Sequence, residues 1–245
     1  MAKKLTINAK GIHFKELNSK IKEAAKKGVT SFTLNNVNGQ RYIGTGIGKE
    51  VKITVNGTAG SDLGAFMSGP DITVKGNAQD AVGNTMNAGK ITVYGHAGDV
   101  CCIAARNGEV YIQTDVAYRA GIHMKEYLDT KPILVIGGRA YDFLGEYMAG
   151  GVLMMLNLKN KKIDSKYIGT GMHGGKIFIR GKIEDHQLGR EVSSVELTDA
   201  DFKTLKKYVA RYCRRFDEDP DKILRSQFTK LVPLSHRPYG KLYTY

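Results

Sequence analysis

The sequence predicts an all-β core, a parallel β-helix of about seven coils over residues 41–182. Three observations lead to this prediction. Stretches rich in Ile and Val recur at spacings of 19 to 25 residues, methionines recur in register upstream of them, and glycines cluster in between. Such a repeat is too short to bury its own apolar face, so it must stack on its neighbours. Stacking places equivalent residues of successive coils in columns, which is the pattern that the sequence contains.

The seven Ile- and Val-rich stretches alternate apolar with more exposed residues, which is the period of a β-strand. Their first apolar position reads Ile53, Ile72, Ile91, Val110, Ile133, Val152 and Ile177. Their second reads Val55, Val74, Val93, Ile112, Val135, Met154 and Ile179. We therefore expect one strand per coil, with these two columns pointing inward.

A second repeated element precedes each strand and ends in a methionine column. An apolar residue comes four residues before the column position, and usually a glycine comes three residues before it. The expected inward column consists of Ile47, Met67, Met86, Ala105, Met124, Met148 and Met172. The pentapeptide YIGTG opens both the first copy and the last copy, so both are predicted to be the same turn of the repeat. Glycine suits such a turn because it adopts positive φ readily. The predicted turn glycines are Gly44, Gly46, Gly48, Gly169 and Gly171.

Residues 1–40 are predicted to form a cap on the first coil. Residues 5–9 alternate like a strand, residues 13–27 place apolar side chains on one helical face, and residues 31–37 form a second alternating stretch. An open end of a β-helix exposes unpaired backbone groups. A strand–helix–strand unit at this end is therefore expected to cover them.

Residues 183–245 are predicted to contain helices and an extended arm. Thr198 and Asp201 resemble a capping box that begins a helix, and a short helix is expected near 220–227. The final stretch, 228–245, has apolar residues but no helical period, so we expect an extended arm that either lies across the β-helix or docks on another chain. Its candidate docking residues are Phe228, Leu231, Pro233 and Tyr239.

The charge distribution argues against a nucleic-acid-binding protein. The net charge is +13, but residues 1–30 carry eight Lys against two Glu, and residues 199–245 carry eleven Lys or Arg against six Asp or Glu. Both segments are expected to be helical, where Lys and Arg commonly form a solvated face. An acidic protein partner and plain solubility explain the basic ends about equally well.

Other features of the composition favour a cytoplasmic protein. No apolar run approaches the length of a membrane helix, and the first residues lack the apolar stretch of a signal peptide. The three cysteines, two of them adjacent, do not form a disulfide framework, which fits a reducing compartment.

No catalytic or ligand-binding motif is found. The stretch GTGIG at 44–48 lacks the G-x-G-x-x-G spacing of a dinucleotide-binding loop, and a strand follows it instead of a helix. The six histidines are scattered, and the adjacent Cys101 and Cys102 are expected to pack in the interior. Glu146 and Tyr147 lie beside a glycine-rich turn, where they are candidates to face a partner. We predict no catalytic residue, no bound cofactor and no metal in this chain.

Several motifs resemble those of the GXGXG family, the right-handed β-helix that forms the C-terminal domain of the glutamate synthase large subunit. They are NNVNGQRYIGTGIG at 35–48, ARNGEVYI at 105–112, EYMAGGVLMML at 146–156 and FTKLVPLSHRPY at 228–239. The resemblance covers nearly the whole chain. The chain departs from the family at Cys101–Cys102, in a region that is usually glycine, and in a lengthened coil at 118–140.

The resemblance implies a non-catalytic scaffold subunit of a split glutamate synthase, in which separate chains replace the single large subunit. The implied partners are an FMN-domain subunit and a class II glutamine amidotransferase subunit, held at a fixed separation so that ammonia passes between them. The resemblance also implies that FMN and iron–sulfur clusters belong to the partner subunits of this oxidoreductase of ammonia assimilation. Whether the isolated chain forms a homo-oligomer stays open.

Two alternatives also stay open. The same fold provides the β-helix subunit of formylmethanofuran dehydrogenase and of N-methylglutamate synthase. A different class is a carbohydrate-active β-helix enzyme, which needs clustered carboxylates on one face. The repeats show no such column in the sequence.

Overall fold

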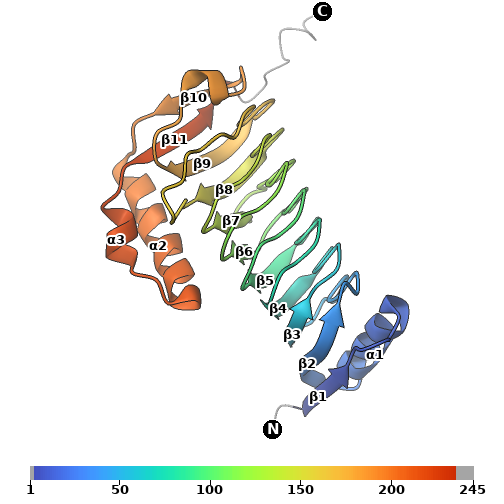
Figure 1. The fold of residues 1–245 in the computed structure, drawn as a ribbon. Helices are drawn as coiled ribbons and strands as arrows, with labels where there is room; N and C mark the ends of the chain where they lie inside the picture. The colour runs from blue at the N-terminus through green and yellow to red at the C-terminus, as the bar shows by residue number, and fades with distance from the viewer. Residues whose placement is uncertain (1–2, 236–245) are drawn as a thin grey trace, which may run out of the picture.

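The computed structural model describes residues 3–235 and confirms a parallel β-helix of about seven turns (Figure 1). One 11-stranded sheet runs through the described residues. The strands of the coils follow one another in this sheet in sequence order, each parallel to the one before. They are β3 (Lys52–Thr58), β4 (Ser68–Lys75), β5 (Ala88–Val93), β6 (Glu109–Ile112), β7 (Ile133–Ile136), β8 (Ala149–Met155) and β9 (Gly174–Arg180).

The predicted strand–helix–strand unit is present at the N-terminal end of the rod (Figure 1). β1 (Lys3–Asn8) pairs in parallel with β2 (Val29–Asn38), and β2 pairs in parallel with β3. Between them in sequence lies α1 (Phe14–Lys26). The Asn18 side chain donates a hydrogen bond to the Arg41 carbonyl at 2.8 Å. This bond ties the helix to the start of the first coil.

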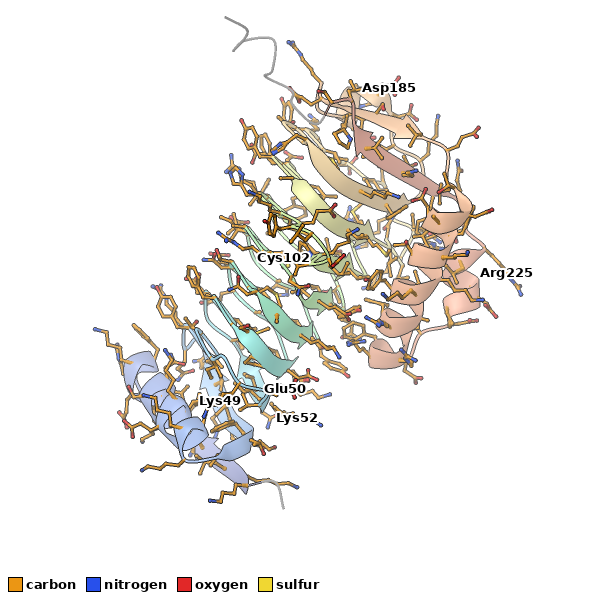
Figure 2. The ribbon with its side chains drawn as sticks, turned by 180° about the vertical axis from the view of Figure 1, so that it is seen from behind. Lys49, Glu50, Lys52, Cys102, Asp185 and Arg225 are labelled. Carbon is orange, nitrogen blue, oxygen red and sulfur yellow. The ribbon has the colours of Figure 1, made fainter. Side chains whose placement is uncertain are left out.

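The methionine column lies in the interior, as predicted. Every member of the column is buried, from Ile47 in the first coil to Met172 in the last. Cys101 and Cys102 are also buried, and Figure 2 shows Cys102 within the stack of coils. The columns therefore form one continuous apolar core that runs along the rod.

The strand register corrects the predicted inner columns in two coils. In β7, Leu134 and Ile136 align with the inner residues of β6, whereas Ile133 and Val135 were expected there. The same shift by one residue occurs in β8. The displaced residues Ile133, Val135, Val152 and Met154 pack in a second apolar cluster on the outer face of the sheet. Both faces of these strands are buried, so every position is apolar and the alternation that identifies the inner face is lost.

Two helices cover this outer face over the last coils (Figure 1). They are α2 (Asp199–Phe216) and α3 (Pro220–Leu224), and a 3-10 turn, η1 (Asp185–Gln187), precedes them. The predicted capping box of α2 is confirmed: the Thr198 side chain accepts from the Asp201 N–H, and the Asp201 carboxylate accepts from the Thr198 N–H. Tyr212 lies in the cluster between helix and sheet, and its hydroxyl donates to the Gln113 carbonyl at 2.8 Å.

Two further strands close the last coil, so residues 228–233 of the expected extended stretch lie across the β-helix. β11 (Phe228–Pro233) pairs antiparallel with both β9 and β10 (Val192–Val195). Phe228 and Leu231 are buried in this arrangement, so these two residues are part of the core and not of a free docking arm. The exposed edge of β9 needs a hydrogen-bonding partner, and the alternating apolar residues of 228–233 supply it.

Candidate interaction surface

Each coil contains a left-handed turn, a five-residue segment in which three alternate residues have positive φ. The middle residues of these turns are Gly44, Gly64, Gly83, Cys102, Gly121, Gly145 and Gly169. Middle residues donate their N–H to the preceding coil, as Gly145 does to the Ala120 carbonyl at 2.8 Å. Third residues donate to the following coil, as Tyr147 does to Thr170 at 2.8 Å. The turns therefore form a second hydrogen-bonded ladder beside the sheet.

Glycine is favoured at the middle position because there is little room for a side chain. A Cβ on Gly64 would lie 2.7 Å from the Ile91 side chain of the next coil, and one on Gly169 would lie 2.7 Å from Val192. Cys102 fills this position with φ of 61°, a conformation that costs a non-glycine residue roughly 1–2 kcal/mol. The sequence signal of the turn is thus the glycine that makes room for the neighbouring inner column.

The five predicted turn glycines occupy three different environments. Gly44 and Gly169 are middle residues of the first and last turns, and Gly46 and Gly171 are third residues, all with positive φ. A Cβ on Gly171 would meet the Tyr147 ring, whereas one on Gly46 would meet nothing within 4 Å. Gly48 follows the first turn, where a Cβ would also meet nothing within 4 Å, and its φ is not positive. The structure therefore gives no steric reason for glycine at Gly48.

The side chains of the first and third turn residues are at least partly exposed. In the later coils, aromatic residues at these positions and two tyrosines just before the turns form an aromatic edge. We define this edge by its side chains, which are Tyr118, His123, Tyr141, Phe143, Tyr147 and Tyr167. Phe143 and Tyr167 stack at 5.0 Å between ring centroids, and His123 and Tyr147 stack at 5.3 Å. Tyr118 and Tyr141 contact edge to face at 5.3 Å. Stacking between coils holds the rings in place before any partner binds.

The aromatic edge is open to solvent. Tyr118, Tyr141 and Tyr167 are 46%, 47% and 52% exposed. Large aromatic side chains that combine an apolar ring with a hydroxyl are enriched at protein interfaces. A contiguous exposed group of this kind is typical of an interaction site.

A charged pair lies beside this edge. The Arg119 Nε lies 3.0 Å from the carboxylate of Glu146, whose residue is only 9% exposed, and the guanidinium lies 4.9 Å from the centroid of the Phe143 ring. Of the two residues predicted to face a partner, Tyr147 belongs to the edge, and Glu146 instead orients Arg119. Sequence reasoning did not find the edge, because its rings come from separate coils that align only in the folded rod.

The predicted docking residues are not brought together as a free surface. Phe228 and Leu231 are buried in β11, Pro233 is partly exposed at its end, and Tyr239 lies outside the described residues. The carboxylates of Asp80 and Asp99 do stack at one corner of adjacent coils, a short column that the sequence reasoning missed. Each accepts a backbone N–H from the next coil, at 2.9 and 3.0 Å, and so has a structural role.

The described part of the chain shows no group of three or more His, Cys, Asp or Glu side chains placed to hold a metal ion. Burial raises the pKa of the Cys102 thiol well above its ordinary value, and burial raises that of Cys213 to about 11. Both thiols are therefore protonated near neutral pH and poorly nucleophilic. Among residues 3–235, no helix is long and apolar enough to cross a membrane.

A cleft of about 960 Å³ follows the starts of the strands from β3 to β6. Figure 2 shows Glu50 and Lys52 at the start of the first of these strands. Lys52, Asp71 and Lys90 are register partners on adjacent strands there. The alternating charges balance one another across the sheet. This cleft therefore has no evident preference for a charged ligand.

Two comparisons relate the chain to known proteins. The profile of the GXGXG motif family matches residues 7–234. An uncharacterized protein of Methanocaldococcus jannaschii is 48% identical over 251 residues, which cover 98% of this chain and 96% of that relative.

Proposed function

The chain belongs to the GXGXG motif family, and we propose that it is a non-catalytic, cytoplasmic scaffold subunit of a split glutamate synthase. It would hold a class II glutamine amidotransferase subunit and an FMN-domain synthase subunit at a fixed separation. Ammonia released by the first would then reach the second without escaping into solvent. FMN and iron–sulfur clusters would belong to the partner subunits.

The family match over residues 7–234 is the single observation that carries this proposal. Rigidity supports it as well. The interior columns are buried along the whole rod, and the coils are joined both through the sheet and through the ladder of left-handed turns. A close-packed interior of this kind resists bending, as a spacer between two subunits must.

We assign partner docking to the aromatic edge. Its rings are pre-stacked, so binding would cost little side-chain entropy, and their hydroxyl groups can pair with polar groups of a partner. The ion pair of Arg119 with Glu146 keeps one cation beside the Phe143 ring of this surface. An interface of this composition binds through a few aromatic anchors.

A pull-down tests the proposal. The full chain is immobilised and offered purified FMN-domain and amidotransferase subunits of a split glutamate synthase. A variant with Tyr118→Ser, Tyr141→Ser and Tyr167→Ser should recover at least tenfold less of one partner, since aromatic anchors are worth more than about 1.4 kcal/mol each. The control is Phe202→Ser, which removes an aromatic ring on α2 that is equally exposed, at 55%.

Recovery of neither partner by the unaltered chain would refute the proposed function. A separate arm offers purified subunits of formylmethanofuran dehydrogenase, and their recovery in place of the glutamate synthase subunits would support the alternative within the same fold. Equal recovery by the triple variant and by the control would leave the scaffold in place and move the docking surface away from the aromatic edge.

A further inference from the structure

A second cleft, of about 1000 Å³, lies beside the last two coils and differs from the first in its charge. The 157–166 segment forms one wall, the segment after β9 forms another, and residues 226–227 complete it. We call it the basic cleft. Its charged lining residues are Lys161, Lys162, Asp164, Lys166, Arg180, Lys182 and Glu184.

Both acidic residues of the basic cleft are already paired. Asp164 lies 3.0 Å from the ammonium of Lys162, and Glu184 lies 3.0 Å from that of Lys182. Within residues 3–235, no carboxylate forms an ion pair with the remaining cations, which are Lys161, Lys166 and Arg180. The cleft therefore carries an uncompensated positive charge.

The Arg180 guanidinium is held in a fixed orientation by neutral groups alone. Its Nε donates to the Ser226 hydroxyl at 2.8 Å. Its Nη1 donates to the carbonyls of Asn157, at 3.1 Å, and Leu156, at 3.4 Å. Nη2 makes no hydrogen bond within the described part of the chain. A guanidinium fork that is oriented but lacks a counter-ion is well suited to bind an oxyanion.

A second arginine supports the same wall from behind. The Arg139 Nη1 donates to the Lys162 carbonyl at 3.1 Å, which fixes the 157–166 segment. The Arg139 Nε is buried and has no hydrogen-bond partner in the described residues. A buried donor without a partner indicates a place where an ion or water belongs. Two arginines thus contribute positive potential to the same segment.

The lining also limits the chemical class of the ligand. Ile163 is the only apolar side chain among the described lining residues, whereas pockets for apolar ligands are lined mostly by such side chains. The neutral polar groups, such as Asn160 and Gln227, suit a hydrated and highly polar molecule. The requirement is therefore for negative charge and not for apolar contact.

We propose that the basic cleft binds a small molecule that carries phosphate or carboxylate groups. Arg180 engages one oxyanion through its free Nη2, and Lys161 and Lys166 neutralise the remaining charge. This site adjoins the aromatic edge, since Lys166 precedes Tyr167, but its existence does not depend on the proposed scaffold role.

Isothermal titration calorimetry on the full chain tests the site, with inorganic phosphate and citrate as probes in separate arms and with NaCl keeping the ionic strength constant. Saturable binding of either probe is expected, and the better probe identifies the preferred oxyanion. Lys161→Gln with Lys166→Gln should weaken binding about tenfold, because two charge-assisted contacts are lost. The control is Lys203→Gln with Lys206→Gln on α2, which removes the same charge from an exposed surface.

Arg180→Lys provides a second test that separates geometry from charge. It keeps the charge but loses the fork, so binding should again weaken about tenfold while the melting temperature shows whether the wall remains folded. Absence of saturable heat with both probes would overturn the proposal. Equal weakening in the α2 control would also overturn it, because binding would then follow net charge alone. Binding of an acidic peptide but of neither small anion would assign the cleft to a macromolecule and contradict a small-molecule site.

Discussion

The terminal methyl group of Met148 lies against Gly175 of the next coil, 2.6 Å from the position that a Cβ on this glycine would take. Met67 faces Gly89 and Met124 faces Gly151 in the same way, each at 3.1 Å. Met86 and Gly108 form a further pair. The methionine column and these glycines therefore pack together. Each thioether fills the space that a glycine in the next coil leaves empty.

The two coils without this pair support the same interpretation. Where the column residue is Ile47 or Ala105, the next coil has Pro70 or Pro132 at the corresponding position, two residues before the first inner strand residue. A shorter or branched column residue does not reach the next coil, so a proline ring fits there. The column residue and the residue that faces it in the next coil therefore change together.

Gly175→Ala should destabilise the fold by about 3 kcal/mol or more, because positive φ and steric overlap act together. Its φ is 84°, and a Cβ would also lie 2.8 Å from the Gly150 carbonyl carbon, so moving Met148 cannot relieve the contact. Urea denaturation measures the change. Gly46→Ala is the control: it has positive φ but open space, and should lose only about 1–2 kcal/mol. An equal loss of unfolding free energy in both variants would contradict this packing of methionine against glycine.

Ile91→Asp should unfold or aggregate the protein. Ile91 is fully buried between Ile72 and Val110 in the inner column. An unpaired carboxylate there costs several kcal/mol, which is on the order of the whole stability margin of about 5–15 kcal/mol. The check is soluble yield and thermal melting, with Asn87→Asp at an exposed position of the same coil as the control. A soluble Ile91→Asp protein with unchanged melting would contradict the assigned inner column.

Asp201 should make the stability depend on pH in the acid range. Its carboxylate is buried, and it lies 2.6 Å from the ammonium groups of both Lys176 and Lys230. Burial acts to raise the pKa of Asp201, but hydrogen bonds from the two lysines and from Thr198 outweigh it and hold this pKa below the usual range. The stabilisation is therefore complete above the unfolded-state pKa of about 3.9 and is lost as the pH falls from there toward the folded pKa.

Asp201→Asn should flatten this pH dependence and lower the stability at pH 7 by about 3–5 kcal/mol, because it leaves the buried Lys230 without its counter-ion. Urea midpoints between pH 2 and pH 7 measure both effects. Asp164→Asn, in an exposed pair, should change the stability by less than about 1 kcal/mol. An Asp201→Asn profile that parallels the unaltered chain would contradict a lowered pKa at this site.

Truncation tests whether β11 is needed for the chain to fold. A chain that ends at residue 235 keeps β11 and is the reference for the comparison. A chain that ends at residue 227 loses Leu231 from the core and Lys230 from its ion pair, so it should unfold or aggregate. Circular dichroism melts of both chains decide the matter. A folded chain ending at residue 227 would restore the interpretation of 228–233 as a free arm.

The coils could be predicted from the sequence because each coil repeats the same pattern of buried and turn positions. Inner residues such as Ile72 and Met86 are apolar in every coil, and the turn glycines mark its corners. The inner face of β7 was misassigned because its outer residues, such as Val135, are apolar for a different reason, which is burial under α2. The pairing of β11 with β9 joins residues about 50 positions apart and leaves no local pattern.

The aromatic edge and the basic cleft were beyond sequence reasoning for a similar reason. The Phe143 and Tyr167 rings stack because they occupy the same turn position in two successive coils, which lie side by side only in the folded rod. Arg180 becomes an anion-binding candidate only when Ser226, 46 residues away, holds its guanidinium. The rings do repeat with the coils, but the sequence alignment followed only the apolar inner columns, and the contacts of Arg180 have no sequence period at all.

Native mass spectrometry of the three purified chains tests the scaffold role most directly. This chain, an FMN-domain synthase subunit and a class II amidotransferase subunit are mixed in pairs and then all together. We expect no complex of the other two subunits without this chain and a ternary complex when all three are mixed. The yield of the ternary complex should fall with the Tyr118→Ser, Tyr141→Ser and Tyr167→Ser variant. Stable association of the other two subunits without this chain, with no ternary mass when it is added, would contradict the account.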